Sequence, residues 1–479
     1  MPPCGGRERA MAEYYLAVDI GASSGRHILG HVEDGKIVLE EVYRFENGME
    51  KKDGHLCWNV PHLFHEIKEG LKACRVAGKV PKSMGIDTWA VDYVLLDEAD
   101  NVIGNTYGYR DGRTKGMDEE VYAIIPETEL YARTGIQKQM FNTIYQLMAV
   151  KKQEPENMEK AVQLLMLPDY FHFLLTGNKL SEYTNATSTQ LVSPETKQWD
   201  YELIERLGYK SSIFRPLHMP GTVVGSFTKE VEEEVGFSCE VVLPATHDTA
   251  SAVISVPALT KDCLYISSGT WSLMGIENDH AICSEESRKR NFTNEGGYEY
   301  RFRYLKNIMG LWMIQSARHE WNDAYSFARL CDMAQEESAF PSRVDVNDDA
   351  FLAPESMLQA IRESCEKKGC AVPETVGQTA AVIYQSLAES YAQTVAEIEE
   401  LTGRHFPAIN IVGGGSNAAY LNQLTADKSG RCVYAGPGEA TAIGNLAVQM
   451  IKDGRFDSLE AVRRCIHDSF GVKKYEPKA

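Results

Sequence analysis

Two turns made of small residues, one in each half of the chain, are candidates for binding phosphate. The first follows an apolar run that ends at Asp19 and consists of Gly21, Ala22, Ser23, Ser24, Gly25 and Arg26. The second is Ser-Ser-Gly-Thr at residues 267–270, and it also follows an apolar run. Small side chains let backbone N–H groups converge on phosphate oxygens, and an arginine adds positive charge. Taken alone, the first turn is equally consistent with a tight hairpin turn that binds nothing.

A carboxylate between two polar residues, in the sequence His247-Asp248-Thr249, could act as a general base. Such a group within hydrogen-bond reach of a hydroxyl can take its proton as a phosphoryl group is transferred. Alternatively, Asp248 or Thr249 could cap the N-terminus of a helix. A His next to an Asp also suggests a catalytic triad, but the sequence has no G-x-S-x-G nucleophile motif.

The chain lacks the two common nucleotide-binding fingerprints. It has no G-x-x-x-x-G-K-[ST] motif, and its nearest approach to G-x-G-x-x-G has Thr441 at the third glycine position. The turn after Asp19 leads into a strand, whereas both fingerprints open a helix. We expect the two small-residue turns to hold a polyphosphate from opposite sides. Three consecutive glycines, Gly413, Gly414 and Gly415, would let an adenosine approach the backbone.

The hydrophobic pattern predicts the elements that position these residues in the first half. The apolar run before the first turn and the segments on both sides of Asp34-Gly35 predict three consecutive strands. Apolar Leu63, Ile67 and Leu71 recur at helical spacing and predict a helix. Residues 117–180 are expected to be mostly helical.

The second half repeats this opening. Residues 262–277 again predict a strand, a small-residue turn and a strand. A long helix over roughly residues 376–401 and a strand that leads into Gly413 follow. This weak internal duplication predicts two similar α/β lobes with a cleft between them, and a boundary near residues 250–258.

Size and composition are those of an ordinary globular protein with two large domains. The chain has 479 residues, too many for one hydrophobic core. Its formal net charge of −19 argues against nucleic acid or a membrane surface as a partner, and no apolar stretch approaches the roughly 18 residues that span a bilayer. The 11 scattered cysteines form no C-x-x-C motif and indicate reduced thiols in the cytoplasm. Residues 1–11 lack the apolar core of a signal peptide and are expected to be a disordered extension.

Stretches spread over nearly the whole chain resemble the FGGY family of carbohydrate kinases. They are AVDIGASSGR (17–26), GIDTWAVDYVLLD (85–97), LPDYFHFLLTG (167–177), EYTNATSTQLV (182–192), HDTASAV (247–253), YISSGTWSLMG (265–275), TNEGG (293–297), KNIMGLWMIQ (306–315) and IVGGGSN (411–417). The resemblance implies the actin/Hsp70-type ATPase fold. In that α/β fold, two ribonuclease H-like lobes, each with a mixed sheet flanked by helices, enclose a cleft. The lobes are expected at residues 12–255 and 256–475.

The resemblance also implies roles for individual residues on the ATP side. Asp248 is expected to be the catalytic base. The first turn, from Ala22 to Arg26, is expected to bind phosphate together with Thr270, and Gln315 and Gly414 to hold the nucleotide. Asp19 is expected to reach Mg²⁺ through water, although an acid satisfied by its own turn is the alternative. For Gln315 the alternative is a polar residue on a helix over residues 308–320.

On the sugar side, His247, Thr249 and Asn307 are expected to contact the substrate. Trp89 offers a flat face to the C–H groups of a sugar, and Asp92 can accept hydrogen bonds from its hydroxyls, but a buried Trp is also a common core residue. The family often has Gly after this Trp, whereas this chain has Ala90, whose methyl group would narrow the approach. For Asn307 the alternative is a helix cap.

The expected reaction is transfer of the γ-phosphoryl group of ATP to the C1 hydroxyl of a ketose, L-rhamnulose, in sugar catabolism. Fuculose or xylulose are alternative acceptors, and a monomer or a homodimer is expected. Two rivals from other classes are a non-kinase ATPase of the same fold, such as a chaperone or filament protein, and a dehydrogenase. The missing dinucleotide fingerprint weakens the latter.

Overall fold

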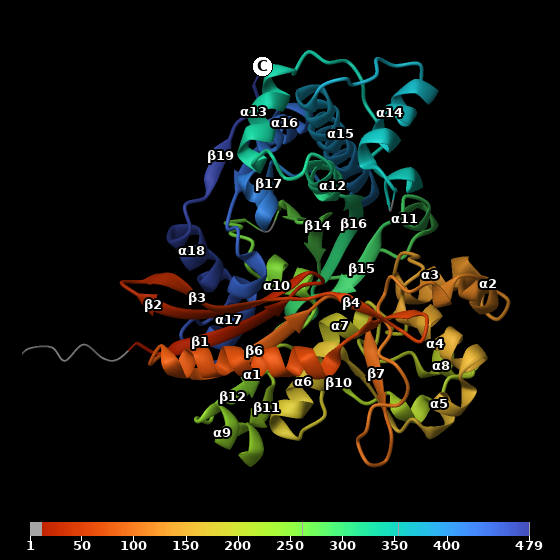
Figure 1. The fold of residues 1–479 in the computed structure, drawn as a ribbon, viewed down its shortest axis with the longest axis vertical. Helices are drawn as coiled ribbons and strands as arrows, with labels where there is room; N and C mark the ends of the chain where they lie inside the picture. The colour runs from red at the N-terminus through yellow and green to blue at the C-terminus, as the bar shows by residue number, and fades with distance from the viewer. Residues whose placement is uncertain (1–11, 261, 353, 479) are drawn as a thin grey trace, which may run out of the picture.

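The computed structural model describes residues 12–260, 262–352 and 354–478, so the extension expected at residues 1–11 lies outside the described residues. The chain forms two α/β halves, one above the other in Figure 1. The upper half is built from residues of the second part of the chain, and the lower half mainly from the first part.

The first half is built on a six-stranded sheet with the order β11-β12-β6-β1-β2-β3. Strands β1 to β3 form the predicted antiparallel meander, β6 pairs with β1 in parallel, and β12 pairs with β6 in parallel. The strands are β1 (Tyr14–Ile20), β2 (Ser24–Glu33), β3 (Lys36–Glu46), β6 (Pro81–Thr88), β11 (Val223–Ser226) and β12 (Glu240–Val242). Short two-stranded ribbons accompany it: β4 (Met49–Lys52) with β5 (His55–Trp58), β7 (Tyr93–Leu96) with β8 (Gln163–Met166), and β9 (Ser181–Glu182) with β10 (Leu217–His218).

The second half is built on a seven-stranded sheet with the order β15-β16-β14-β13-β17-β18-β19. Its strands are β13 (Leu264–Ser268), β14 (Trp271–Asn278), β15 (Thr293–Gly296), β16 (Phe302–Met309), β17 (Ala408–Val412), β18 (Cys432–Ala435) and β19 (Lys473–Tyr475). Read from β16 to β19, the strand pairs run antiparallel, antiparallel, parallel, parallel and antiparallel. The first sheet, read from β3 to β11, has the same sequence of directions. The predicted duplication into two similar lobes is therefore confirmed by the topology.

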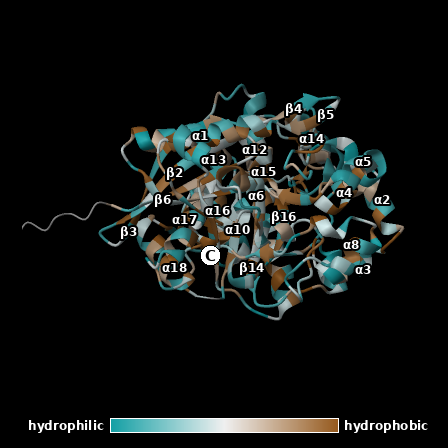
Figure 2. Ribbon diagram, turned by 90° about the horizontal axis from the view of Figure 1, so that it is seen from below, coloured by the Kyte–Doolittle hydropathy of each residue, from teal (hydrophilic) through white to brown (hydrophobic). Residues whose placement is uncertain are grey.

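Amphipathic helices cover both sheets, and their teal and brown faces are visible in Figure 2. In α1 the predicted Leu63, Ile67 and Leu71 are all buried, because they face the sheet. The helices of the first half are α1 (Val60–Val76), α2 (Met117–Tyr122), α3 (Glu127–Thr134), α4 (Thr143–Gln153), α5 (Pro155–Lys160), α6 (Leu167–Thr176), α7 (Tyr183–Thr187), α8 (Tyr201–Arg206), α9 (Lys229–Val235) and α10 (Asp248–Ile254). Those of the second half are α11 (Glu285–Lys289), α12 (Trp312–Glu320), α13 (Phe327–Glu336), α14 (Met357–Lys367), α15 (Val376–Thr402), α16 (Ala419–Ser429), α17 (Ala440–Lys452) and α18 (Leu459–Ser469).

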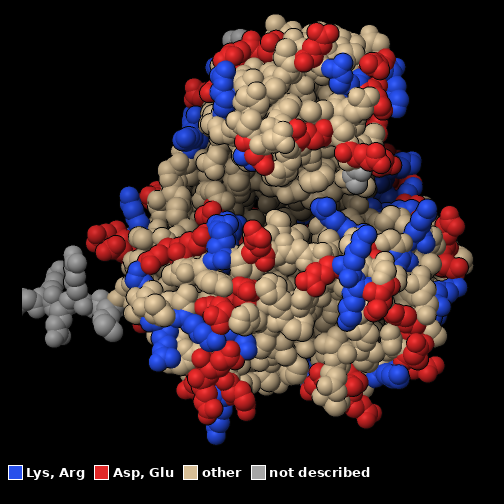
Figure 3. All heavy atoms as spheres, viewed as in Figure 1, with Lys and Arg blue, Asp and Glu red and all other residues tan. Residues whose placement is uncertain are grey.

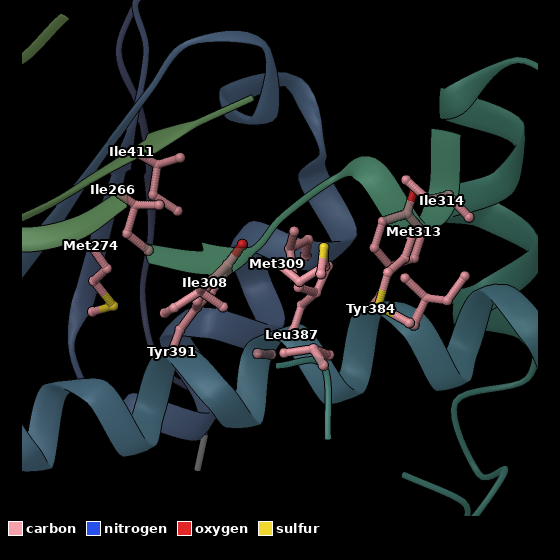
Figure 4. Packing of buried hydrophobic residues seen from close by; sticks show 14 of the residues in the cluster. Ile266, Met274, Ile308, Met309, Met313, Ile314, Tyr384, Leu387, Tyr391 and Ile411 are labelled. Atoms are coloured by element: carbon pink, nitrogen blue, oxygen red, sulfur yellow. The ribbon is translucent and has the colours of Figure 1, made fainter. Parts of the chain in front are cut away.

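The long helix α15 forms the centre of the upper core. Figure 4 shows Tyr384, Leu387 and Tyr391 of α15 against side chains of the seven-stranded sheet and α12. The hydroxyl groups of Tyr391 and Ser272 are 2.6 Å apart, so the polar end of this tyrosine is satisfied inside the core. This packing fixes β14 and α12, which border the second small-residue turn.

Helix α17 belongs to the second part of the chain but packs on the first sheet (Figure 1). Its Gln449 side chain donates to the backbone carbonyl of Leu16 on β1 (2.9 Å). It crosses α10 so closely that a Cβ on Gly444 would lie 1.7 Å from the carbonyl oxygen of Ser251. The two halves therefore share a tightly packed helix pair behind the site. None of the helices in the described part of the chain combines the length and the apolar character needed to cross a membrane.

Candidate active site

A cavity of about 840 Å³ lies between the two halves. Figure 3 shows the molecular surface hollowed between the upper and lower parts, with acidic and basic residues interspersed around it. Most of the predicted site residues line this cavity: Asp19, Ala22, Ser23, Ser24, Arg26, Trp89, Ala90, His247, Asp248, Thr249, Thr270, Asn307, Gln315 and Gly414. The other two, Gly25 and Asp92, are not among the described residues that form its wall.

The first small-residue turn joins β1 to β2. The backbone N–H of Gly21 donates to the carbonyl of Ser24 (2.9 Å), and the side chain of Asn47 donates to the carbonyl of Gly21 (2.8 Å). Gly25 packs against the core, where a Cβ would lie 2.1 Å from the ring of Phe45. The conformation of the turn is therefore fixed by contacts inside the first half, and its small side chains face the cavity.

The second turn meets the three consecutive glycines at Ser268. A Cβ on Gly415 would lie 1.9 Å from the Ser268 Oγ, and Gly413 has a φ of 83°, a conformation that favours glycine. The backbone N–H of Trp312 donates to the carbonyl of Thr270 (3.1 Å), which ties the start of α12 to the same turn. The close approach of these segments explains why this part of the sequence needs glycine.

Three carboxyl groups lie near one another beside the cavity: those of Asp19 and Asp87 are buried, and that of Asp248 is 32% exposed. Asp19 on β1 and Asp87 on β6 are partners in the parallel register, and Asp248 is the first residue of α10. Burial raises the pKa of each group, and the charge of Asp19 raises the pKa of the other two further. For Asp248 the pKa rises to about 7. Its carboxylate can therefore exchange a proton near neutral pH, as a general base requires.

An arginine and an asparagine partly balance the negative charge of these carboxyl groups. The Arg26 guanidinium lies 3.0 Å from Asp19 Oδ2 and 2.6 Å from Glu439 Oε2, so it bridges the first turn and the start of α17. The side chain of Asn445 donates to Asp87 Oδ2 (2.6 Å). The pKa of Asp87 lies well above its ordinary value, because the group is fully buried beside Asp19. Burial and the Asp19 charge thus favour the neutral form of Asp87, whereas Arg26 favours the charged form of Asp19.

The donor set fits a divalent cation that arrives with a nucleotide rather than one held in a protein cage. Within residues 12–260, 262–352 and 354–478, no three His, Cys, Asp or Glu side chains form a metal-binding cluster. Asp19 nevertheless lines the cavity beside the first turn. Its carboxylate forms an ion pair with Arg26 (3.0 Å). Mg²⁺ in phosphoryl-transfer sites commonly uses one or two carboxylates and takes its remaining ligands from water and phosphate.

The helix-cap interpretation of Asp248 and Thr249 is wrong. His247 occupies the N-cap position of α10, without a side-chain capping bond. Asp248 Oδ1 instead accepts hydrogen bonds from the N–H (2.5 Å) and the hydroxyl (3.1 Å) of Thr249. The carboxylate is therefore oriented by its neighbour at the mouth of the cavity.

Asp92 holds the side chains of Trp58 and Trp89 in place by hydrogen bonds. It is 1% exposed, and its Oδ2 accepts from the indole N–H groups of Trp58 (2.6 Å) and Trp89 (2.9 Å). Its Oδ1 accepts from the amide of Gln146 (3.0 Å). The two indole rings lie 3.9 Å apart between centroids. The structure thus gives both Asp92 oxygens to protein donors, and we interpret the residue as one that fixes the orientation of Trp89.

Replacing Asp92 by Ala is expected to lower the free energy of unfolding by roughly 2–4 kcal/mol, because several buried donors lose their acceptor. A ligand that contacts Trp89 should also bind more weakly, because the ring is no longer held. Denaturant unfolding followed by tryptophan fluorescence measures the first effect. Asp468→Ala, at an exposed position of α18, is the matched control. Unchanged stability of the Asp92 variant would contradict this interpretation.

His247 lies in a buried charged network. Arg303 Nη2 is 3.1 Å from His247 Nδ1 and 3.0 Å from Glu295 Oε2. On the other side of the ring, His247 Nε2 is 3.5 Å from Asp248 Oδ1. Burial and the Arg303 charge lower the pKa of His247 well below its ordinary value. The imidazole is therefore neutral, and Nδ1 faces a permanent donor, which leaves the hydrogen on Nε2, toward Asp248.

Asn307 and Gln315 line the cavity from the second half. Asn307 lies in β16, so the helix-cap interpretation is wrong, and its amide donates to Gln137 Oε1 across the cavity wall (2.9 Å). Gln315 lies on α12, which begins at Trp312 rather than at the expected residue 308, because residues 308–309 complete β16. The hydrogen bond between Asn307 and Gln137 joins the two halves across the cavity wall.

Several site residues were missed from the sequence. Asp87 follows the same pattern as Asp19, an acid at the end of an apolar strand, and could have been found by that signal. Glu295, in the stretch TNEGG, is an acid on a fully buried strand. Gln137 and Arg303 carry no local signal, because long-range packing alone brings them to the site.

Comparisons with known proteins show the family to which the chain is similar. The sequence profile of the FGGY family of carbohydrate kinases matches with its N-terminal domain at residues 14–255 and with its C-terminal domain at residues 264–452. The chain is 53% identical to a protein of Halalkalibacterium halodurans named rhamnulokinase, over 96% of this chain and 98% of the relative. It is 50% identical to a rhamnulokinase of Oceanobacillus iheyensis, over 97% of this chain and 98% of the relative.

Solved structures share the fold at low sequence identity. The gluconate kinase of Lactobacillus acidophilus superposes with a TM-score of 0.78 at 17% identity, covering 98% of this chain and 94% of that one. The glycerol kinase of Plasmodium falciparum, solved with ADP, has a TM-score of 0.77 at 14% identity, with the same coverage of 98% and 94%. The expected fold of two actin-like lobes with mixed sheets is confirmed.

Proposed function

Because the chain belongs to the FGGY family of carbohydrate kinases, we propose that it transfers the γ-phosphoryl group of ATP to the C1 hydroxyl of L-rhamnulose. The family makes it an ATP-dependent sugar kinase that works with a divalent metal. The choice of sugar rests on the relatives named rhamnulokinase, at up to 53% identity. The products would be L-rhamnulose 1-phosphate and ADP.

One observation carries the chemistry: Asp248 lies in the cavity wall with a pKa raised to about 7. In the proposed reaction its carboxylate takes the proton of the C1 hydroxyl as the oxygen attacks the γ-phosphorus. Thr249 orients the carboxylate through its N–H and hydroxyl. Neutral His247 presents Nε2–H on the same side and is suited to donate to a sugar oxygen.

The phosphate side of the proposal uses both small-residue turns. Backbone N–H groups of the first turn and Thr270 of the second would bind the polyphosphate from opposite lobes. Arg26, which lines the cavity, would add positive charge, and Gln315 and Gly414 would hold the nucleoside. Mg²⁺, held through water by Asp19, would neutralise charge on the phosphates when bound.

The sugar side combines one apolar face with polar groups. Trp89 would stack on the C–H groups of the sugar, with Ala90 beside it. Thr249 and Asn307 offer hydrogen-bonding groups to the hydroxyls. Closure of the two halves around the sugar would exclude water, so that the phosphoryl group reaches sugar and not water.

The decisive experiment is an ADP-release assay of the purified protein with L-rhamnulose, fuculose, xylulose, fructose and glycerol. We expect the highest kcat/KM with L-rhamnulose and a phosphate ester at C1 of the product. A higher kcat/KM with another acceptor would replace the proposed substrate. ATP hydrolysis that no sugar stimulates would favour a non-kinase ATPase instead.

We expect kcat/KM for the sugar to fall about tenfold per pH unit below pH 7, because Asp248 acts only when deprotonated and its pKa is about 7. Burial and the Arg303 charge lower the pKa of His247 well below its ordinary value, so Asp248 is the group expected to set the profile near pH 7. Initial rates between pH 5 and pH 9 at fixed ATP and metal concentrations measure the profile. A rate that stays constant down to pH 5 would exclude Asp248 as the base.

The proposed setting is the cytoplasm, where ATP is available. Reduced cysteines in the described residues agree with that setting, because none of them forms a disulfide. The proposed partners are ATP and a ketose, without nucleic acid or membrane, in a monomer or a homodimer.

A further inference from the structure

Glu295 is an acidic residue of the cavity wall that the proposed reaction leaves without a role. It lies on β15, the edge strand of the seven-stranded sheet, and is 8% exposed. A carboxylate is rarely buried to this extent unless a charged partner accompanies it. The partner is Arg303, which lies directly opposite on β16 and is fully buried.

This pairing leaves hydrogen-bonding capacity unused. Arg303 donates through Nε to the carbonyl of Gly296 (3.0 Å), while its Nη2 is shared between Glu295 and His247. Among the described residues, Glu295 Oε2 and Arg303 Nη1 are inaccessible atoms without an aligned hydrogen-bond partner, and Oε2 lies 3.0 Å from Arg303 Nη2. The other carboxylate oxygen, Oε1, is not among these inaccessible atoms. Because Glu295 lines the cavity, Oε1 is the oxygen that can accept a hydrogen bond from a bound ligand.

The chemistry of the site selects the kind of donor. The negative charge of Glu295 disfavours a phosphate group, and Arg303 already supplies the neighbouring positive charge. A neutral hydroxyl fits, since carboxylates form strong charge-assisted hydrogen bonds with hydroxyl donors. Glu295 Oε2 lies 3.4 Å from His247 Nδ1, and Asp248 Oδ1 lies 3.5 Å from Nε2. The two carboxylates thus lie at opposite ends of one imidazole ring, a separation that a short polyhydroxyl chain can span.

The neighbouring contacts hold this part of the wall in place. The backbone N–H of Asn294 donates to the carbonyl of Gly135 (2.9 Å), which fixes β15 against the first half. Gln137, two residues further on, accepts from Asn307 (2.9 Å). Glu295 therefore lies on a rigid surface that includes residues of both halves, as a substrate-reading group requires.

We propose that Glu295 is a further sugar-binding residue, whose carboxylate accepts a hydrogen bond from a ketose hydroxyl beyond C1, with Arg303 as its positioning residue. The inference rests on the proposed function and deepens it, because it names a residue that selects the sugar by its hydroxyl pattern. No bond is made or broken at Glu295.

The test compares Glu295→Gln with Glu277→Gln. Glu277 forms a similar ion pair with Arg463 in the same half (2.8 Å) and is not among the described residues that line the cavity. Titration calorimetry without ATP gives the Kd of the best acceptor found for the wild type. We expect Glu295→Gln to raise this Kd roughly 10- to 100-fold, with an unchanged KM for ATP, and Glu277→Gln to leave it unchanged.

Deoxy sugars separate a direct contact from a structural role. For 3-deoxy, 4-deoxy and 5-deoxy analogues of the acceptor, the Glu295→Gln penalty should disappear for the one that lacks the contacted hydroxyl. An equal penalty for all analogues, or none for the parent sugar, would overturn the inference. Glu295→Asp keeps the charge beside Arg303 and serves the same comparison if the Gln variant does not fold. A wild type that phosphorylates no sugar would instead refute the proposed function.

Discussion

Replacing Asp248 by Asn is expected to lower kcat by roughly 10²- to 10⁴-fold, the usual cost of removing a general base. The amide oxygen of Asn can still accept from the Thr249 N–H, so the start of α10 keeps its geometry. The variant also removes a charge from a position where desolvation is the main cause of the raised Asp248 pKa. Its melting temperature should therefore equal or exceed that of the wild type.

Three measurements on this variant make the result interpretable. Sugar binding without ATP and the melting temperature report the fold, and single-turnover transfer reports the chemical step. Asp118→Asn is the matched control, because Asp118 also lies in the first turn of a helix, α2, but pairs with Lys138 outside the cavity wall. A folded Asp248 variant with nearly wild-type turnover would rule out the proposed base.

The second large effect is expected at Asp19. Asp19→Asn should lower kcat roughly 10²- to 10³-fold, the range found when one group that stabilises transition-state charge is lost. It should also raise the Mg²⁺ concentration needed for half-maximal rate, because the cavity loses the charge that favours the cation. Arg26 remains paired with Glu439 at 2.6 Å, so the first turn should keep its conformation.

Glu439→Gln is the control for Asp19. It removes the other acidic partner of Arg26 and leaves the 3.0 Å pair with Asp19 in place. Glu439 is 44% exposed in its side chain, so its contribution is small. Rates measured over a range of Mg²⁺ concentrations should therefore stay within a few-fold of the wild type. An Asp19 variant with unaltered metal dependence would contradict the metal role.

The local parts of this site could be predicted from the sequence. The turn after Asp19 and its counterpart before Trp271 carry their own signal, because small residues between two apolar strands specify a hairpin turn whatever the rest of the chain does. The helix with Leu63, Ile67 and Leu71 was likewise predictable, since its apolar spacing faces a single core. In these elements, residues close together in the sequence determine the local structure, so the sequence pattern is sufficient to predict it.

The remainder depends on contacts between distant residues. An aspartate such as Asp92 is a residue type that often binds sugar hydroxyls. In the structure, however, its carboxylate oxygens accept hydrogen bonds from Trp58 and Gln146, which are distant in the sequence. A helix cap is an alternative for Asn307 in the sequence, whereas in the structure strand β16 of the seven-stranded sheet extends through it. Arg303 could not be found at all, since only the register of β15 against β16 places it opposite Glu295.

The position of α17 has a consequence for how the protein is made. This helix supplies Ala442, Ile443 and Leu446 to the core behind the first sheet, and its Asn445 satisfies the buried Asp87. It is synthesised long after the strands that it covers. During synthesis, one apolar face of the first sheet therefore stays uncovered until α17 has emerged from the ribosome. The sheet reaches its final packing only after that point.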